Sequence, residues 1–133
     1  MSSRSAFIFS ALAGFTAVAL GAFGAHALKE RLAAAAMTSV WDKAVLYHLV
    51  HAVAIFAASL TLANESRAGS PWLGRAVGAW LFGILLFSGS LYALALGGPR
   101  WTGFITPFGG LSFLAGWLFV GLHGRNRMSS LAE

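Results

Sequence analysis

The sequence predicts an all-α integral membrane protein: one domain over residues 1–133, folded as an antiparallel bundle of four transmembrane helices. The composition is the first observation behind this prediction. Of the 133 residues, 58% are hydrophobic and 10% are charged, with a mean hydropathy of +0.75, which leaves too little polar surface for a soluble domain. The second observation is that four stretches contain no Asp, Glu, Lys or Arg, namely 5–28, 44–64, 76–99 and 101–124. Each stretch supplies the roughly 20 helical residues that cross the hydrocarbon core of a bilayer.

The first helix is expected over about 5–28. Arg4, the apolar run and the small residues 25–27 imitate a secretory signal, but the run is longer than the apolar part of such a signal, so we expect a retained span. Small residues recur along it with alternating spacings of four and three, at Ser10, Gly14, Ala17, Gly21 and Gly24. Such a stripe lets helix backbones approach closely. It predicts tight packing of the first span on the fourth, or contact with a second protomer in a homo-oligomer or a larger membrane complex.

The second helix is expected over about 40–63. Ser39, followed three residues later by Asp42, resembles a capping box at its start. Between the first two spans, apolar residues recur every fourth position from Leu28 to Val40, which suits a helix lying in the membrane interface. A simple extension of the first span is the alternative.

The third and fourth helices are expected over about 71–96 and 107–124. Ser70-Pro71 and Thr106-Pro107 share one device, a hydroxyl N-cap followed by Pro at the first helical position. Gly97-Gly98-Pro99 predicts a turn, followed by a short interfacial stretch up to Thr106.

Four spans place both termini on one side of the membrane. Trp41, Trp72 and Trp101 stand near span starts, where amphipathic rings favour the headgroup level. The side of the termini carries Arg4, Arg67, Arg75, Arg125 and Arg127, and the other side carries Lys29, Arg31, Lys43 and Arg100. This count of five against four favours cytoplasmic termini.

The placement of polar residues excludes several classes of function. The cations lie along tails and short loops, so no basic face is available for nucleic acid. Cys is absent, which excludes thiolate metal sites and Cys nucleophiles. The middle of every span lacks ionised groups, which argues against a carboxylate-driven transporter. No nucleophile elbow, phosphate loop or pair of carboxylates is present, so we expect neither an enzyme nor a cofactor.

Threading the spans alternately up and down brings polar side chains from all four helices to one side of the membrane. The predicted cluster consists of His26, Tyr47, His48, His51, Ser88, Ser90, Tyr92, Arg100 and Thr106. His48 and His51 are three residues apart and share one helix face. His123 lies apart from this cluster and is expected to be an interfacial residue.

Three interpretations of the cluster are open. In the first, its members hydrogen-bond across helices and stabilise the bundle. In the second, its imidazoles ligate a metal or haem. In the third, the cluster binds a lipid headgroup, quinone or small polar ligand, with Arg100 available for an anion. The structural interpretation is favoured and no metal site is expected, because no carboxylate or HExxH pattern supports the histidines.

Several segments also resemble a known family. These are residues 21–29, Tyr47 with His51-Ala52, residues 86–92, residues 106–110 and Gly116-Trp117. They are similar to the YgdD-type small inner-membrane proteins, a family of unknown function to which a mitochondrial transmembrane protein of animals is also similar. The resemblance implies a four-helix protein of the bacterial inner membrane and brings no activity.

The family pattern bears on the cluster residue by residue. It picks out His26, Tyr47, His51, Ser88, Ser90, Tyr92, Thr106 and Pro107. Ala27 stands where Gly is expected, and His48 where other polar residues are usual, which weakens a three-histidine metal site. We therefore expect a structural or accessory membrane component in contact with membrane lipids. The alternative is a binding protein or small transporter for a lipid, quinone or other small molecule.

Overall fold

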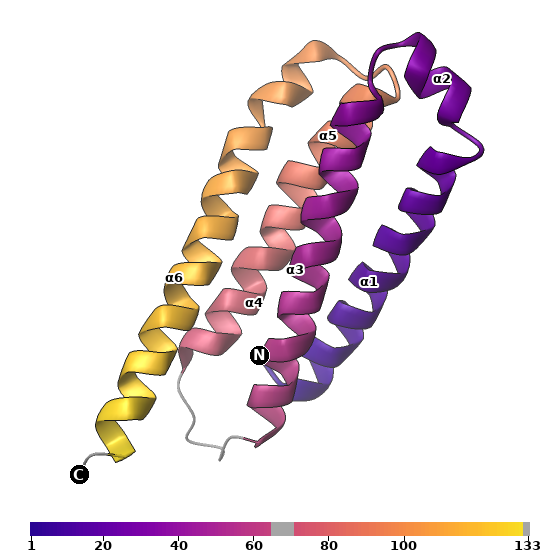
Figure 1. The fold of residues 1–133 in the computed structure, drawn as a ribbon. Coiled ribbons are helices and arrows are strands. Elements are labelled where there is room, and N and C mark those ends of the chain that lie inside the picture. Colours follow the sequence, from indigo (N-terminus) through magenta and orange to yellow (C-terminus); the bar gives the residue numbers. More distant parts are fainter. Residues whose placement is uncertain (65–70, 132–133) are drawn as a thin grey trace.

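The fold is all-helical, as predicted. A computed structural model describes residues 1–64 and 71–131, and no strand occurs within these ranges. The first two spans are α1 (Ser3–Ala25) and α3 (Thr38–Asn64), joined by the short α2 (Lys29–Ala34). The third span runs through α4 (Pro71–Gly83), the π-helical turn η1 (Ile84–Ser88) and α5 (Gly89–Ala95). A 3₁₀ turn, η2 (Arg100–Phe104), leads into α6 (Thr106–Leu131), the last span (Figure 1). All four spans are long and apolar enough to cross a membrane, which confirms the four predicted spans.

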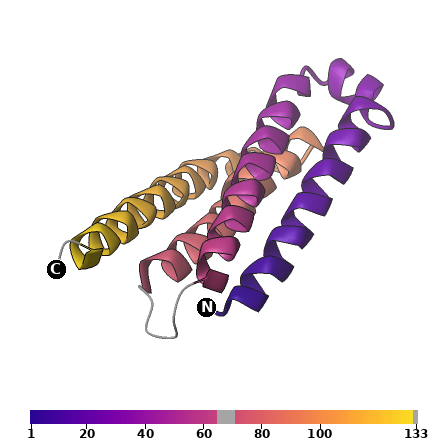
Figure 2. The same cartoon turned by 60° about the horizontal axis from the view of Figure 1, so that its bottom comes forward.

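The spans lie alternately up and down, with α1 on one flank and α6 on the other (Figures 1 and 2). Both termini lie at one end of the bundle, and α2 and η2 lie at the opposite end. α3 packs on the third span along its length, and α6 packs on α4 and η1. A core of apolar side chains from the four spans fills the space between them, with Ile55, Val77 and Trp80 among its most deeply buried members.

The prediction that the first span packs on the fourth is wrong, because α1 packs on α3 instead. The small residues explain the choice of neighbour. A Cβ on Gly24 would overlap the indole of Trp41, and one on Gly21 would lie 3.3 Å from Val45, so the stripe of α1 accommodates side chains of α3. The Trp41 ring is 1% exposed and its Nε1 donates to the Leu20 carbonyl at 3.0 Å. Trp41 thus lies near the start of its span, as predicted, but its ring is buried against α1.

The other two tryptophans near span starts remain at the surface. Trp101 is exposed, and Trp72 is half-buried with the Arg75 guanidinium 4.6 Å above its ring.

Glycines also bring α6 onto the third span. A Cβ on Gly109 would overlap the backbone of Phe87, and one on Gly116 would overlap the Trp80 ring. Between them, Ser112 Oγ donates to the Ala79 carbonyl at 2.7 Å. The Gly74-x-x-x-Gly78 pattern has no such use: Gly74 faces Met1, and a Cβ on Gly78 would meet no described atom within 4 Å.

The connection between α1 and α3 contains a separate helix, so a simple extension of the first span is wrong. α2 ends in a Schellman motif, in which the Met37 amide donates to the Leu32 carbonyl at 2.8 Å and the Ala36 amide to the Ala33 carbonyl at 3.0 Å. Ala36 has a φ of 54° there. The predicted turn at Gly97 uses the same motif at the end of α5, with a φ of 90°.

Two of the predicted N-caps are wrong. α3 begins at Thr38, before Ser39, and the amides of Val40 and Trp41 donate to the Met37 carbonyl. α6 begins at Thr106, and the Phe108 amide donates to the Ile105 carbonyl. Carbonyls of the preceding turns take these amides, which leaves the Thr106 hydroxyl for another partner. Ser70, the third predicted cap, lies outside the described residues.

Candidate functional site

His48 joins three helices through both of its ring nitrogens. Its Nε2 lies 3.4 Å from Thr16 Oγ1 on α1, and its Nδ1 lies 3.4 Å from the Tyr92 hydroxyl on α5. The Thr16 hydroxyl donates to the Leu12 carbonyl at 2.8 Å, so it accepts from His48 Nε2–H. The Tyr92 hydroxyl then donates to Nδ1. The result is one directed chain of hydrogen bonds from α5 through α3 to α1.

His51 joins α3 to α6. Its Nδ1–H donates to the Tyr47 carbonyl at 2.8 Å, and its Nε2 accepts from Trp117 Nε1–H at 3.3 Å. The imidazole stacks on Phe113, with ring centroids 3.6 Å apart and planes 9° apart. His51 is only 4% exposed, so these contacts account for both nitrogens of a buried ring.

Ser90 and Thr106 form a third, separate group. Their hydroxyls are 2.7 Å apart and connect α5 to α6, and Ser90 also bonds to the Phe87 carbonyl at 3.0 Å. Ser88 lies in η1 and is fully buried, and its hydroxyl has no hydrogen-bond partner among the described residues. The predicted residues that do form hydrogen bonds thus fall into three separate groups and not into one shared cluster.

His26 and Arg100 lie apart from these groups. Both are exposed and belong to the loop end of the bundle, His26 directly after α1 and Arg100 in η2. An α-helix rises 1.5 Å per residue, so His48, ten residues into α3, lies about 15 Å deeper than that end. Tyr47 lies near His51 and is 41% exposed, with its ring centroid 4.6 Å from that of Phe87. His123, expected at the interface, is 6% exposed and lines a cavity of about 210 Å³.

Three residues of these groups, Thr16, Phe113 and Trp117, were not among the predicted site residues. Thr16 was detectable, because it lies nine residues before the end of α1 while His48 lies ten residues after the start of α3. Residues equally far from the turn between two antiparallel helices lie at the same level. Phe113 carried no comparable signal, because aromatic residues are common throughout the spans. Trp117 belongs to a segment that resembles the family, but nothing in its spacing linked it to His51.

A groove of about 550 Å³ opens beside His51. Its walls come from α3, η1 and α6, and it is lined by Tyr47, His51, Phe87, Pro107, Gly110, Leu111, Phe113, Leu114 and Trp117. Among these side chains only Tyr47, His51 and Trp117 carry polar atoms. His51 and Trp117 bond to each other, and the Tyr47 hydroxyl makes no hydrogen bond within the described part of the chain.

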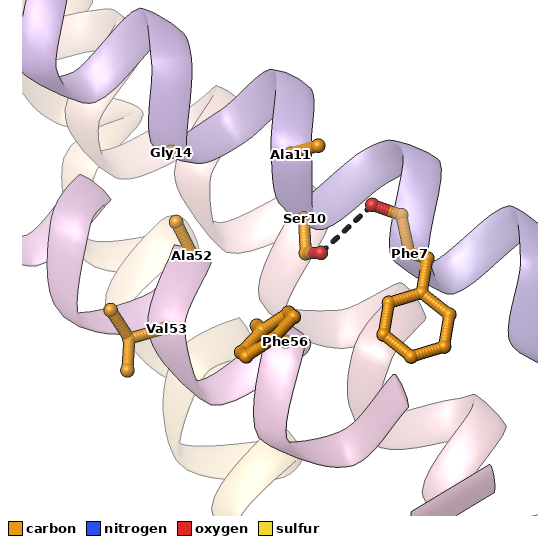
Figure 3. A pocket seen from close by; sticks show the side chains of 7 residues that line it. All are labelled: Phe7, Ser10, Ala11, Gly14, Ala52, Val53 and Phe56. Carbon is orange, nitrogen blue, oxygen red and sulfur yellow. Dashed lines mark hydrogen bonds between the residues drawn. The ribbon is translucent and has the colours of Figure 1, made fainter. Parts of the chain in front are cut away.

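A second groove lies between α1 and α3 (Figure 3). It is lined by Phe7, Ser10, Ala11, Gly14, Ala52, Val53 and Phe56. Figure 3 shows its one hydroxyl, Ser10, turned to the Phe7 carbonyl of the same helix, to which it donates at 2.9 Å. The groove therefore offers apolar contact and no free polar group.

Comparison with known proteins places these features in a family. Residues 20–110, more than half of the chain, match the family described as "Protein of unknown function (DUF423)". The chain belongs to the DUF423 family. The nine predicted site residues, from His26 to Thr106, fall inside the matched range, whereas Thr16, Phe113 and Trp117 fall outside it.

Relatives of the DUF423 chain support the membrane assignment. It is 45% identical to the UPF0382 inner membrane protein YgdD of Escherichia coli over 90% of this chain and 88% of that protein. It is 43% identical to a UPF0382 membrane protein of Staphylococcus saprophyticus, over 85% and 90% of the two chains. A UPF0382 membrane protein of Haemophilus influenzae is 43% identical over 81% and 83%. No solved structure matches the chain. The predicted family and a multi-pass inner-membrane location are confirmed, and none of the three relatives is named as an enzyme.

Proposed function

We propose that this DUF423 chain is a structural or accessory component of the inner membrane without catalytic activity. In this proposal His48 and His51 stabilise the bundle through hydrogen bonds between its helices. One observation carries the proposal: all four ring nitrogens of these histidines already have protein partners. A nitrogen engaged in this way would have to give up a hydrogen bond within the protein before it could ligate a metal.

The size of the expected contribution is modest for each contact and larger for the group. Interhelical hydrogen bonds inside a membrane protein are worth about 0.6 kcal/mol on average. The buried dispersion contact between the His51 and Phe113 rings, whose centroids are 3.6 Å apart, adds about 1 kcal/mol. Removing His51 also leaves the Trp117 N–H without its acceptor, at a cost of about 1 kcal/mol or more.

We therefore expect His51→Ala to lower the free energy of unfolding by about 2–3 kcal/mol. Thermal unfolding in detergent measures this as a fall in the midpoint temperature. His26→Ala is the matched control, because His26 is exposed and lies outside the bonded groups; it should leave the midpoint unchanged. Unchanged stability of His51→Ala, together with loss of a copurified species in native mass spectrometry, would overturn the structural role.

A second candidate function is that of a binding protein or small transporter for a lipid, quinone or other small molecule. The groove between α3, η1 and α6 favours it, because this groove adjoins His51 and holds the one unbonded hydroxyl of its lining, that of Tyr47. Arg100 does not line the groove, which argues against an anionic ligand there. Native mass spectrometry of protein released directly from membranes tests this function by the small molecules that the chain retains.

A further inference from the structure

We propose that the groove beside His51 binds the planar, carbonyl-bearing ring of a membrane quinone, with the Tyr47 hydroxyl donating to a ring carbonyl. This inference rests on the second candidate function and names its ligand class. It concerns binding alone and includes no redox step.

The groove is open to the bilayer at a depth where water is scarce. Leu111 and Leu114 on its rim are 63% and 66% exposed, as expected for side chains that face lipid. Tyr47 is nine residues from the start of α3, which places it about 13 Å along that helix. The hydrocarbon core is about 30 Å thick, so a ligand enters this groove from the membrane.

The polar atoms of the lining define the ligand's polar chemistry. His51 uses Nδ1 on the Tyr47 carbonyl and Nε2 on Trp117 Nε1–H, so neither histidine nor tryptophan has capacity left. The Tyr47 hydroxyl is the remaining donor, and a donor without a partner in hydrocarbon is costly. One donor on an otherwise apolar wall fits a neutral ligand that presents one accepting oxygen.

The aromatic side chains define the ligand's shape. Tyr47, His51 and Phe113 lie nearly parallel, with interplanar angles of 17° for Tyr47 and His51 and 25° for Tyr47 and Phe113. Tyr47 on α3 is 41% exposed and Trp117 on α6 is 49% exposed, so both rings have free surface. Flat ligands gain from offset stacking on such rings.

A phospholipid matches this lining less well. No cation lines the groove to bind a phosphate, since Arg100 is not part of it. The ester carbonyls of a phospholipid accept hydrogen bonds, but its flexible acyl chains offer no flat ring to stack on Tyr47 and Trp117. A quinone supplies both parts, because its ring carries carbonyl groups and its isoprenoid tail extends along the exposed leucines.

The test is a titration of the full chain, in phosphatidylcholine nanodiscs, with a ubiquinone that carries a single isoprene unit. Quenching of tryptophan fluorescence reports binding near Trp117. Tyr47→Phe removes the donor and keeps the ring. Gly110→Leu fills the groove, and Gly110→Ala is a milder change, because a Cβ on Gly110 would lie 3.9 Å from the Phe87 ring, an ordinary contact. Gly121→Leu is the matched control on α6, at a glycine outside the groove with no described atom within 4 Å of its Cβ position.

We expect saturable quenching of the unmodified chain and of Gly121→Leu. Binding should be about fivefold weaker in Tyr47→Phe, as for the loss of one hydrogen bond. It should be weakened in Gly110→Ala and lost in Gly110→Leu, with unfolding midpoints measured alongside to show that each variant is folded.

Other outcomes overturn the proposal in distinguishable ways. Quenching that never saturates, or that is equal in all variants, excludes a quinone site. A retained phospholipid that Gly110→Leu loses, without quinone binding, overturns the quinone assignment and leaves the binding function standing. If neither lipid nor quinone depends on Gly110, the binding function fails as well, and the structural role remains.

Discussion

The two histidines of α3 carry their protons on different nitrogens. His48 donates from Nε2 and accepts at Nδ1, because Thr16 already uses its hydrogen on its own helix. His51 donates from Nδ1 to a carbonyl, which can only accept, and receives Trp117 Nε1–H at Nε2. Two imidazoles three residues apart are thus fixed in opposite tautomers, His48 by partners on α1 and α5 and His51 by a carbonyl of α3 and an indole of α6. This explains why paired histidines in one helix need not indicate a metal site.

Ala36 offers a direct test of backbone strain at a single position. Its φ of 54° lies in the left-handed region, where an L residue with a Cβ pays about 1 kcal/mol that glycine does not. The equivalent position after α5 is Gly97. We expect Ala36→Gly to raise the free energy of unfolding by up to about 1 kcal/mol, seen as a higher thermal midpoint in detergent.

Ala35 supplies the control for this substitution. It precedes Ala36, is also exposed, and has a φ of −85° in the right-handed helical region. Ala35→Gly should therefore leave stability unchanged or lower it, because glycine there adds only backbone entropy to the unfolded chain. Equal effects of the two substitutions would show that the Schellman motif after α2 is not strained.

The docking of α6 onto the third span depends on backbone approach more than on side-chain shape. Gly109 lies against the Phe87 backbone within η1, where the helix widens and the Gly89 amide donates to the Ile84 carbonyl five residues earlier. We expect Gly109→Ala to force α6 away from η1 and to destabilise the protein by about 2 kcal/mol. The loss should appear in thermal unfolding and should also weaken the Ser90–Thr106 bond beside it.

Gly121→Ala is the companion measurement. Gly121 is on the same helix, but a Cβ there would meet no described atom within 4 Å. Since alanine favours a helix by about 1 kcal/mol over glycine, this variant should be neutral or stabilised. A Gly109→Ala protein as stable as Gly121→Ala would contradict the close approach of α6 to η1.

The sequence predicts the four helices well, and their neighbours less well. Span length and the absence of charge determine where a helix crosses the bilayer, and both are local properties of the chain. Which helix packs against which is not a local property. The stripe from Ser10 to Gly24 indicates that another helix approaches α1 closely, but only the contact of Gly24 with Trp41 shows that this helix is α3. The helix starts at Thr38 and Thr106 were displaced for a similar reason, because carbonyls of the preceding turns took the amides that hydroxyl caps were expected to bind.

The residues of the predicted cluster are divided among several places in the structure. His48, His51, Ser90, Tyr92 and Thr106 do make contacts between helices, as polar groups in lipid must. His26 and Arg100 were included because they lie on the same side of the membrane, although depth along the helix separates them from His48 by about 15 Å. Counting residues from each turn distinguishes positions at different depths, whereas knowing the side of the membrane alone does not.

The molecule as a whole has an open side at α1. This helix packs on α3 and has no extensive contact with α6 in the described ranges, so the two flanking spans do not close the bundle into a ring (Figure 2). Trp41 and the Thr16–His48 bond hold α1 in place from the α3 side. The expected homo-oligomer or larger complex remains a prediction, and Gly21, which faces Val45 within the chain, is not the position at which to test it.

The expected orientation in the membrane depends on a difference of one cationic residue between the two sides. The start of α1 and the end of α6 lie at one end of the bundle. The sequence assigns five cationic residues to that side against four to the other, and one of the five, Arg67, lies outside the described residues. We expect cytoplasmic termini, because Lys and Arg near span ends favour the cytoplasmic side. A fluorescent-protein fusion at the C-terminus should therefore fluoresce, and an alkaline phosphatase fusion there should be inactive.

Arg125→Gln with Arg127→Gln lowers the count to three against four and should produce a mixed population with measurable phosphatase activity. The pair Arg125→Lys with Arg127→Lys keeps the charge and should behave like the unmodified chain. Phosphatase activity of the unmodified fusion would place the termini outside and reverse the assignment for every loop.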